Sequence, residues 1–414
     1  MATVEVVESA VPTASASARP HRLWRVVRRI LVVAAAVGVM FLLIQTFTIG
    51  PTATLRVLRH GDSTIGDYAV FPGRTFQSSS RPERWRENLV QSEPVLSTTL
   101  DAANGSLAQF MAETQTVALV VIVDGELRFE AYGSDHGPTD LSQIFSASKS
   151  VVSLLIGAAT DDGLMGSIDD PITRYLPELG AGFEKVTLRH LLTMTSGTNY
   201  VEDDNPFGMH VRFNYTDDLE SQIVRLETVM PPGEAFEYRS GDNAMLGLAL
   251  ERSLDETTLT DYLWTRLWDP IGAQTGGVWS TDREDGLERT WCCLAVTARD
   301  LARLGQLVLD EGRWHGTQLI SADWIERSTG GDLLSRDVLP DWFRESSIHS
   351  YSYQWWVPAA DGSEVVAIGK DGQYLYVDRQ RRAVMVRLGW TAGGLATSEW
   401  LDVASQLFDH VDED

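Results

Sequence analysis

Residues 146–159 read Ser146-Ala147-Ser148-Lys149-SVVSLLIGAA, a short polar start followed by an apolar run. The run is apolar almost all round, which predicts a buried helix that ends near Gly163. Residues three apart share a face at the start of a helix, so the Lys149 amine can reach the Ser146 hydroxyl. A buried lysine whose pKa is lowered can act as a base toward a serine nucleophile. The stretch therefore predicts both a central helix and a nucleophile–base pair.

Lysine is rare in this chain, because it occurs only at Lys149, Lys185 and Lys370 among 34 basic residues. Arginine carries the other positive charges, so a lysine is expected where a compact amine that can lose its proton is needed. Lys149 stands in an S-x-x-K pattern and Lys370 in Lys370-Asp371-Gly372. The S-x-x-K pattern alone also fits a capping or packing serine, since short motifs match by chance.

Tyr238 lies between these two motifs, in Tyr238-Arg239-Ser240, after a Pro-Gly turn and before a helix expected from about Asn243. A tyrosine near a lysine cation ionises more easily and can relay a proton to a leaving group. The alternative is a core tyrosine whose hydroxyl is satisfied by a neighbour.

The Lys370-Asp371-Gly372 stretch lies between two strand-like runs and has two interpretations. One is an Asp-Gly hairpin turn with a solvated lysine. The other is a strand edge that lines a pocket, where Lys370 supplies positive charge and Gly372 lets substrate approach the backbone. In that case the N–H groups of Gln373 and Ser146 would form an oxyanion hole.

The order of strand-like and helix-like segments predicts an α+β fold. An early hairpin is expected around Asp124-Gly125, and three strands are expected near the C-terminus, with mostly helical sequence between them. This order predicts an antiparallel sheet built from early and late segments, with an inserted helical region. The expected strands are Val117–Val123, Leu127–Tyr132, Val365–Ile368, Gln373–Val377 and Ala383–Leu388; the expected helices include Leu100–Met111, Leu188–Met194, Leu246–Ser253, Ala298–Leu309 and Thr397–His410.

The N-terminal region predicts a membrane anchor. Residues 30–49 form an apolar run of the length that a spanning helix needs, and five arginines precede it. The positive-inside rule then places residues 1–29, an expected disordered tail, in the cytoplasm and the body outside. A cleaved signal peptide is the alternative, although the run is long for one and no clear A-x-A site follows closely. We divide the chain into the tail 1–29, the anchor 30–49, a linker 50–67 and a globular body 68–414.

The composition excludes some classes of partner. The chain has a formal net charge of −24 although residues 1–50 carry five arginines and only two glutamates, so the body is strongly acidic. Such a body argues against nucleic acid as a partner. The two cysteines are the neighbours Cys292 and Cys293, which are expected to be buried and unpaired, because adjacent cysteines do not easily form an unstrained disulfide. Their surroundings contain no His/Cys cluster that predicts a zinc site.

The ordered motifs S-x-x-K, Y-x-S and K-x-G resemble those of the serine β-lactamase and penicillin-binding-protein superfamily. The resemblance is to the class C β-lactamase-like branch, and within it to esterases and nylon-oligomer (6-aminohexanoate dimer) hydrolases. It covers roughly residues 68–414. Framework phrases extend it beyond the three motifs: Ser167-Ile168-Asp169-Asp170-Pro171, Tyr175-Leu176-Pro177, residues 188–197 (LRHLLTMTSG), residues 297–305 (TARDLARLG) and Tyr353-Gln354-Trp355-Trp356.

The resemblance implies a β-lactamase-like fold and a division of roles. Ser146 would form an acyl-enzyme, while Lys149 and Tyr238 would share the acid–base work. The N–H groups of Ser146 and Gln373 would hold the oxyanion, and Lys370 would lie beside the substrate. No metal or organic cofactor is implied.

Two departures from the class C pattern bear on the substrate. Ser240 stands where those enzymes carry asparagine. Asp371 stands where they carry the threonine of their Lys-Thr-Gly motif. A carboxylate at that place would repel the carboxylate of a β-lactam. We therefore expect a membrane-anchored hydrolase of a small ester or amide. The alternatives are a peptidoglycan D-alanyl carboxypeptidase or D-amino-acid amidase, and a non-catalytic penicillin-binding-like scaffold.

Overall fold

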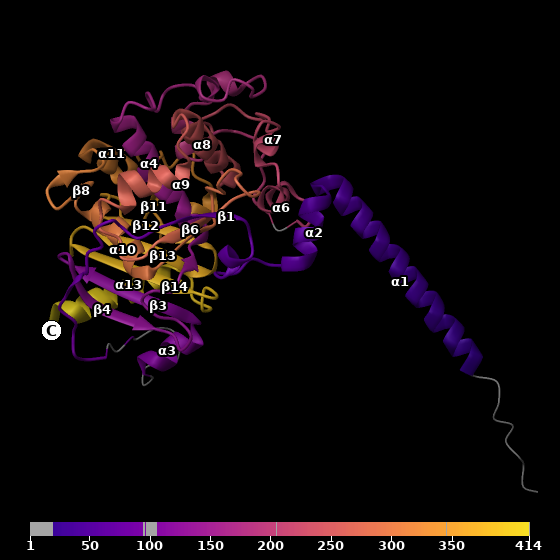
Figure 1. The fold of residues 1–414 in the computed structure, drawn as a ribbon, viewed down its shortest axis with the longest axis horizontal. Helices are drawn as coiled ribbons and strands as arrows, with labels where there is room; N and C mark the ends of the chain where they lie inside the picture. Colours follow the sequence, from indigo (N-terminus) through magenta and orange to yellow (C-terminus); the bar gives the residue numbers. More distant parts are fainter. Residues whose placement is uncertain (1–19, 94–95, 97–105, 204, 345, 414) are drawn as a thin grey trace, which may run out of the picture.

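The computed structural model describes residues 20–93, 96, 106–203, 205–344 and 346–413. Its centre is an eight-stranded sheet in which all neighbouring strands are antiparallel except β2 and β4 (Figure 1). Early strands lie beside late ones, which confirms the predicted α+β class and its antiparallel sheet. In spatial order the strands are β10 (Ser350–Ser352), β11 (Trp355–Val357), β12 (Glu364–Gly369), β13 (Gln373–Asp378), β14 (Ala383–Gly389), β3 (Thr116–Val123), β4 (Glu126–Tyr132) and β2 (Arg86–Glu87).

Strand β3 shows why the sheet lies at the centre of the molecule. All eight of its residues are buried, and they read TVALVVIV. Successive side chains of a strand point to opposite faces, so a run with no polar alternation requires cover on both faces. Its even-numbered residues from 118 to 122 join a cluster that includes helix α10 (Ala298–Leu309). Its odd-numbered residues from 119 to 123 join a cluster with α3 (Leu107–Glu113) and α13 (Thr397–Glu413).

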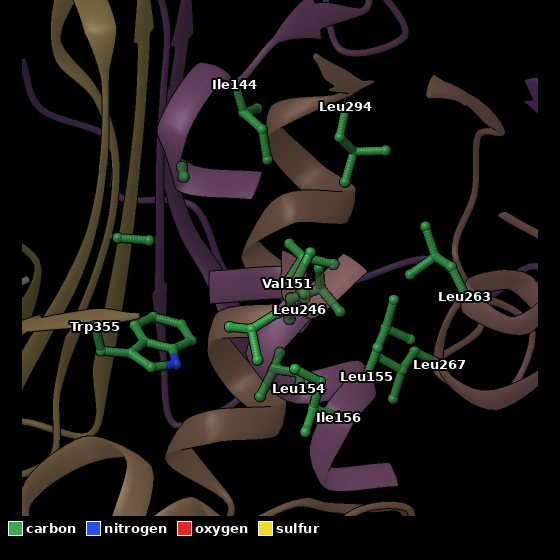
Figure 2. Packing of buried hydrophobic residues seen from close by; sticks show 14 of the residues in the cluster. Ile144, Val151, Leu154, Leu155, Ile156, Leu246, Leu263, Leu267, Leu294 and Trp355 are labelled. Atoms are coloured by element: carbon green, nitrogen blue, oxygen red, sulfur yellow. The ribbon is translucent and has the colours of Figure 1, made fainter. Parts of the chain in front are cut away.

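A helical layer built around α4 (Ser148–Asp161) and α8 (Ser240–Ser253) covers the face that carries the site. Figure 2 shows Val151, Leu154 and Leu155 of α4 packed beside Leu246 of α8. Helix α8 begins three residues before the predicted start. The expected helix at 100–111 is observed as α3, which begins later because Ser106 caps its start by accepting a hydrogen bond from the backbone N of Gln109; residues 100–105 lie outside the described residues. The remaining helices of the body are α5 (Leu188–Leu192), α6 (Met209–Tyr215), α7 (Leu219–Ile223), α9 (Leu259–Leu263), α11 (Ala322–Glu326) and α12 (Asp341–Arg344).

A smaller antiparallel sheet lies close to the predicted nucleophile. Its order is β1-β6-β7-β5, with bounds Gly73–Phe76, Gly277–Ser280, Leu294–Val296 and Ser142–Gln143. Strand β5 leads directly into the turn that carries Ser146, and β7 pairs with β5 directly after the two cysteines. The sheet therefore holds segments that are far apart in the sequence against one another. A separate hairpin joins β8 (Arg313–Trp314) and β9 (Thr317–Gln318).

The N-terminal helix α1 (Pro20–Ile49) extends away from the body (Figure 1). Its segment Trp24–Ile49 is long and apolar enough to cross a membrane, and nearly all its side chains are exposed. Within the expected linker, residues 51–60 form a second helix, α2 (Pro51–His60), which packs against α6. Residues 1–19, most of the predicted cytoplasmic tail, lie outside the described residues.

Candidate active site

Ser146 lies in a tight turn (Phe145–Ala147) immediately before α4, so its hydroxyl is presented at the start of a buried helix. The preceding residue, Phe145, has a φ of +46°, in the left-handed region that residues with a side chain rarely adopt. Such conformations concentrate at functional sites, where the surrounding structure enforces them. Here the turn carries the chain from β5 into α4.

Lys149 lies in the first turn of α4, and its side chain is buried. Its Nζ donates hydrogen bonds to Ser146 Oγ at 2.9 Å and to the carbonyl oxygen of Trp291 at 3.0 Å. Burial lowers the pKa of Lys149 to about 8, against an opposing contribution from the negative charge of Glu202. A neutral amine is therefore accessible near neutral pH, and it would point at the serine hydroxyl.

Tyr238 completes the predicted trio from the residues before α8. The Lys149 ammonium lies 4.8 Å from the centroid of its ring, and the ring stacks on that of Trp356 at 5.5 Å. Burial and the charge of Glu202 raise the pKa of Tyr238 above its usual value, while hydrogen bonding with Ser146 acts in the opposite direction. The sequence suggested a tyrosine that ionises easily, but burial favours the protonated form, a proton donor.

Ser240 bonds to a carboxylate that the sequence motifs did not indicate. Its backbone N and its Oγ both donate hydrogen bonds to Glu202, each at 2.7 Å. His210 lies 3.5 Å from the same carboxylate and contacts the hydroxyl of Tyr200 at 2.8 Å. Glu202 therefore fixes the start of α8 and places a negative charge beside Lys149 and Tyr238. Its acidic loop carries no motif that could have singled it out.

Lys370 lies at the same cavity as Ser146, but its charge is already paired. Its Nζ forms an ion pair with Asp62 at 2.5 Å and donates to the carbonyl and hydroxyl oxygens of Ser63 at 3.4 and 3.2 Å. Both partners belong to the segment that follows α2. The sequence did not predict that this segment reaches the site.

Gly372 and Gln373 are not among the residues that line the cavity. Gly372 has a φ of +72°, and a Cβ there would meet Arg387 Nη1 at 2.7 Å, so both conformation and close packing require glycine. The Gln373 side chain donates to the carbonyl oxygens of Lys370 and Gly389. Gln373 begins β13, which packs against the Ser146 turn, so its N–H stays a predicted oxyanion donor.

A cavity of about 280 Å³ opens above Ser146. The predicted residues Ser146, Ser240 and Lys370 line it, as do the acidic residues Glu202 and Asp203. The sequence missed its remaining charged and aromatic lining because these side chains come from unconnected segments. They include Asp67, Phe71, His210, Tyr215, Arg289 and Trp291.

The expectation that the two cysteines are unpaired is wrong. Cys292 and Cys293 form a disulfide between neighbouring residues, and both line the cavity. Cys293 has a φ of +72°, so the backbone adopts a left-handed conformation at this point. The disulfide directly follows Trp291, whose carbonyl oxygen accepts the hydrogen bond from Lys149. The ring is thus part of the wall that positions the predicted base.

Gln354 joins the helices that carry the site. Its Nε2 donates to the carbonyl oxygens of Leu191 and Leu192 in α5, and its Oε1 accepts from Asn243 in α8 at 3.1 Å. Its own carbonyl oxygen accepts from Ser150 Oγ in α4 at 2.6 Å. Since every partner is buried, this cross-link holds the three helices in a fixed relation.

Comparisons with known proteins agree with this geometry. The family model named Beta-lactamase matches residues 104–403. The chain is 29% identical over 322 residues to the 6-aminohexanoate-dimer hydrolase of Paenarthrobacter ureafaciens. The aligned region covers 73% of this chain and 80% of that protein.

Solved structures show the same fold. A Bacillus anthracis protein named, provisionally, a 6-aminohexanoate-dimer hydrolase superimposes with a TM-score of 0.68 at 21% identity, over 84% of this chain and 92% of the other. A family VIII carboxylesterase gives a TM-score of 0.57 at 15% identity, over 72% and 95%. With the family model spanning the segments that carry Ser146, Lys149 and Tyr238, the chain belongs to the Beta-lactamase family and is one of its serine hydrolases.

Proposed function

We propose that the protein is a membrane-anchored serine hydrolase that cleaves a small ester or amide through an acyl-enzyme on Ser146. The observation that carries the proposal is the contact of 2.9 Å between the buried Lys149 amine and Ser146 Oγ. A lysine whose pKa is lowered to about 8 by burial is suited to take the serine proton. A lysine with only a structural role would more commonly be exposed or paired with a carboxylate.

In the proposed reaction, neutral Lys149 takes the hydroxyl proton of Ser146 while Oγ attacks the carbonyl carbon of the substrate. The N–H groups of Ser146 and Gln373 would stabilise the oxyanion of the tetrahedral intermediate. Tyr238 donates its proton to the departing alcohol or amine and is reprotonated by Lys149. Water then attacks the acyl carbon, with the same groups acting in reverse order, and releases the acid and free Ser146.

The substrate class follows from the relatives and from the motifs. The similar proteins named above include a 6-aminohexanoate-dimer hydrolase and a carboxylesterase, and the proposed acyl-enzyme chemistry on Ser146 serves both esters and amides. Asp371 stands where a hydroxyl would help to receive the carboxylate of a β-lactam, and its charge would oppose that carboxylate. Small linear esters or amides are therefore the proposed substrates, in preference to β-lactam antibiotics.

The membrane placement rests on α1. The apolar segment Trp24–Ile49 has the length of a spanning helix, and arginines precede it. With those arginines in the cytoplasm, the catalytic body lies outside the membrane. A leader that is removed would leave the body free, and the mass of the protein extracted from membranes distinguishes the two cases.

The test is the mass of the intact protein after incubation with a fluorophosphonate, for the wild type and for Ser146→Ala. A single adduct in the wild type, absent from the folded Ser146→Ala variant, is the expected result. An adduct that survives the substitution would identify another nucleophile, and no adduct on folded wild-type protein would contradict the proposed activity. Hydrolysis of p-nitrophenyl esters, short amides, a D-Ala-D-Ala peptide and nitrocefin then ranks the substrate classes.

A further inference from the structure

Arg289 is a buried cation in the wall of the cavity above Ser146. Its residue is only 2% exposed, yet it contributes to the cavity lining. The chain around it is pinned, since its backbone N donates to the carbonyl oxygen of Ser280 and its carbonyl oxygen accepts from Trp279 Nε1. It also lies two residues before Trp291, whose carbonyl oxygen holds Lys149. The backbone of Arg289 is therefore held in place at the wall of the site.

The guanidinium of Arg289 has few partners for a buried charge. Its single hydrogen bond within the described chain is a long one, from Nη2 to the carbonyl oxygen of Thr216 at 3.4 Å, and its Nε has no partner. Among the described residues it has no carboxylate within salt-bridge distance; the charge of Asp282 acts on it from farther away, and that of Arg56 opposes it. The ring of Phe71 lies beneath it, with Cζ 5.0 Å from the ring centroid. A buried cation that lacks an anion is costly unless a ligand compensates it.

Other buried arginines of the same chain show what satisfied partners look like. Arg387 donates five hydrogen bonds to backbone carbonyls and a threonine hydroxyl. Arg303 pairs with the buried carboxylate of Asp300. Arg289 has neither arrangement, although it is buried to the same degree. The difference singles out the one of these three arginines that lines the cavity.

The other cation in the lining is not available in the same way. Lys370 is paired with Asp62 and bonded to Ser63, so an anionic ligand would have to displace the segment that follows α2. The acidic lining residue Glu202 is engaged by Ser240. The neighbours of Arg289 are aromatic rather than acidic: its guanidinium lies over the ring of Phe71, and the ring of Tyr215 is 5.9 Å from that of Phe71.

We propose that Arg289 is a binding site for a carboxylate carried by the substrate. A guanidinium suits this role because its planar donors match the two oxygens of a carboxylate, and a partly dry wall strengthens the interaction. The inference rests on the proposed hydrolase function and adds to it the chemical class of substrate: a small ester or amide with a carboxylate at a distance from the scissile bond. The carboxylate is received on the Phe71 side of the cavity, and not at Lys370.

The experiment compares two p-nitrophenyl esters of the same chain length, the hydrogen glutarate, which carries a carboxylate, and the neutral pentanoate. The ratio of their kcat/KM values is measured for the wild type, Arg289→Met, Lys370→Met and Arg86→Met. Arg86 is a matched control because its side chain is 82% exposed and pairs with Glu126 on the far edge of the large sheet. The ratio cancels changes in folded fraction and in the chemistry at Ser146.

The wild type is expected to prefer the glutarate ester, and Arg289→Met to lower the ratio about 10-fold or more, because a hydrogen bond to a charged group is lost. Arg86→Met and Lys370→Met should keep a ratio near that of the wild type. A wild-type ratio at or below one, or a ratio abolished by Lys370→Met and not by Arg289→Met, would overturn the proposal.

If Arg289→Met does not fold, Arg289→Lys replaces it; this variant keeps the charge but loses the planar fork, and a smaller fall in the ratio is expected. A ratio unchanged in Arg289→Lys would also count against the site. Failure of the hydrolase function has a different signature, since the wild type would then cleave neither ester and Ser146 would not react with a fluorophosphonate.

Discussion

Both carboxylate oxygens of Glu202 accept hydrogen bonds from Ser240, one from its backbone N and one from its Oγ, each at 2.7 Å. Ser240 is the residue that departs from the asparagine of class C β-lactamases, and here it holds a carboxylate beside the catalytic trio. The negative charge acts to raise the pKa values of both Lys149 and Tyr238: it opposes the effect of burial at Lys149, whose pKa stays lowered, and adds to the effect of burial at Tyr238. The Y-x-S form of the motif thus sets the electrostatics of the site through a residue from another segment.

Replacing Lys149 by methionine removes the proposed base and keeps a side chain of similar length. We expect kcat/KM for a neutral p-nitrophenyl ester to fall about a hundred- to ten-thousand-fold, the range typical of acid–base groups. Fluorophosphonate labelling of Ser146 should slow by a similar factor. Lys185→Met is the matched control, because Lys185 is exposed. Labelling at the wild-type rate in a folded Lys149→Met variant would show that another group activates Ser146.

The pH dependence of kcat/KM should report the Lys149 amine. The group is active when neutral, so kcat/KM is expected to rise with pH and to level off above a midpoint near pH 8, its pKa. Glu202→Gln removes a charge that raises this pKa, so the midpoint should move to lower pH. Glu126→Gln, at the exposed pair with Arg86, serves as the control. A midpoint that moves upward in Glu202→Gln, or does not move, would contradict this assignment.

The disulfide between Cys292 and Cys293 should influence the base through the neighbouring carbonyl. Reduction frees the backbone that presents the Trp291 oxygen to Lys149, a hydrogen bond of 3.0 Å. We expect kcat/KM to fall about 2- to 10-fold, the worth of one hydrogen bond. The measurement compares the oxidised protein with protein reduced by a phosphine, and thiol alkylation followed by mass analysis verifies the reduction.

The double variant Cys292→Ser/Cys293→Ser provides the second arm of this test. It should reproduce the activity of the reduced wild type and respond no further to reductant. Full activity in verifiably reduced protein would show that the ring does not help to position Lys149.

Asp242 makes stability depend on pH. Its carboxyl lies buried in α8 and accepts from Ser196 Oγ at 2.6 Å, while its other oxygen has no partner among the described residues. Burial raises its pKa to about 7. The contribution of such a carboxyl to stability is fully present at pH values below its unfolded-state pKa of about 4. It is lost as the pH rises through its folded-state pKa of about 7.

Asp242→Asn removes this dependence, because the amide stays neutral throughout. The fall in Tm of the protein between pH 4 and pH 7 should therefore be smaller in the variant than in the wild type. Thermal unfolding followed by circular dichroism measures it, and Asp124→Asn, at an exposed ion pair with Arg382, is the control. Parallel Tm curves for the wild type and Asp242→Asn would refute the assignment.

The fold class and the local geometry of the nucleophile could be predicted from patterns along the chain. The continuous apolar run of β3 requires cover on both faces, and the helix periodicity after Ser146 places Lys149 one turn away. These features depend on spacing along one segment, so patterns in the sequence can predict them. The order of strands at the two ends of the chain likewise predicts the antiparallel sheet.

The electrostatics of the site and the composition of its walls depend instead on contacts between distant segments. Glu202 reaches Ser240 across 38 residues, and Asp62 reaches Lys370 across 308. Arg289 meets the ring of Phe71 from a distant segment and forms no ion pair with a carboxylate of the described residues. Charge interactions depend on distance and burial in space, and neither is encoded in local spacing. The disulfide of Cys292 and Cys293 is accompanied by a left-handed backbone conformation at Cys293, which adjacency in the sequence does not predict.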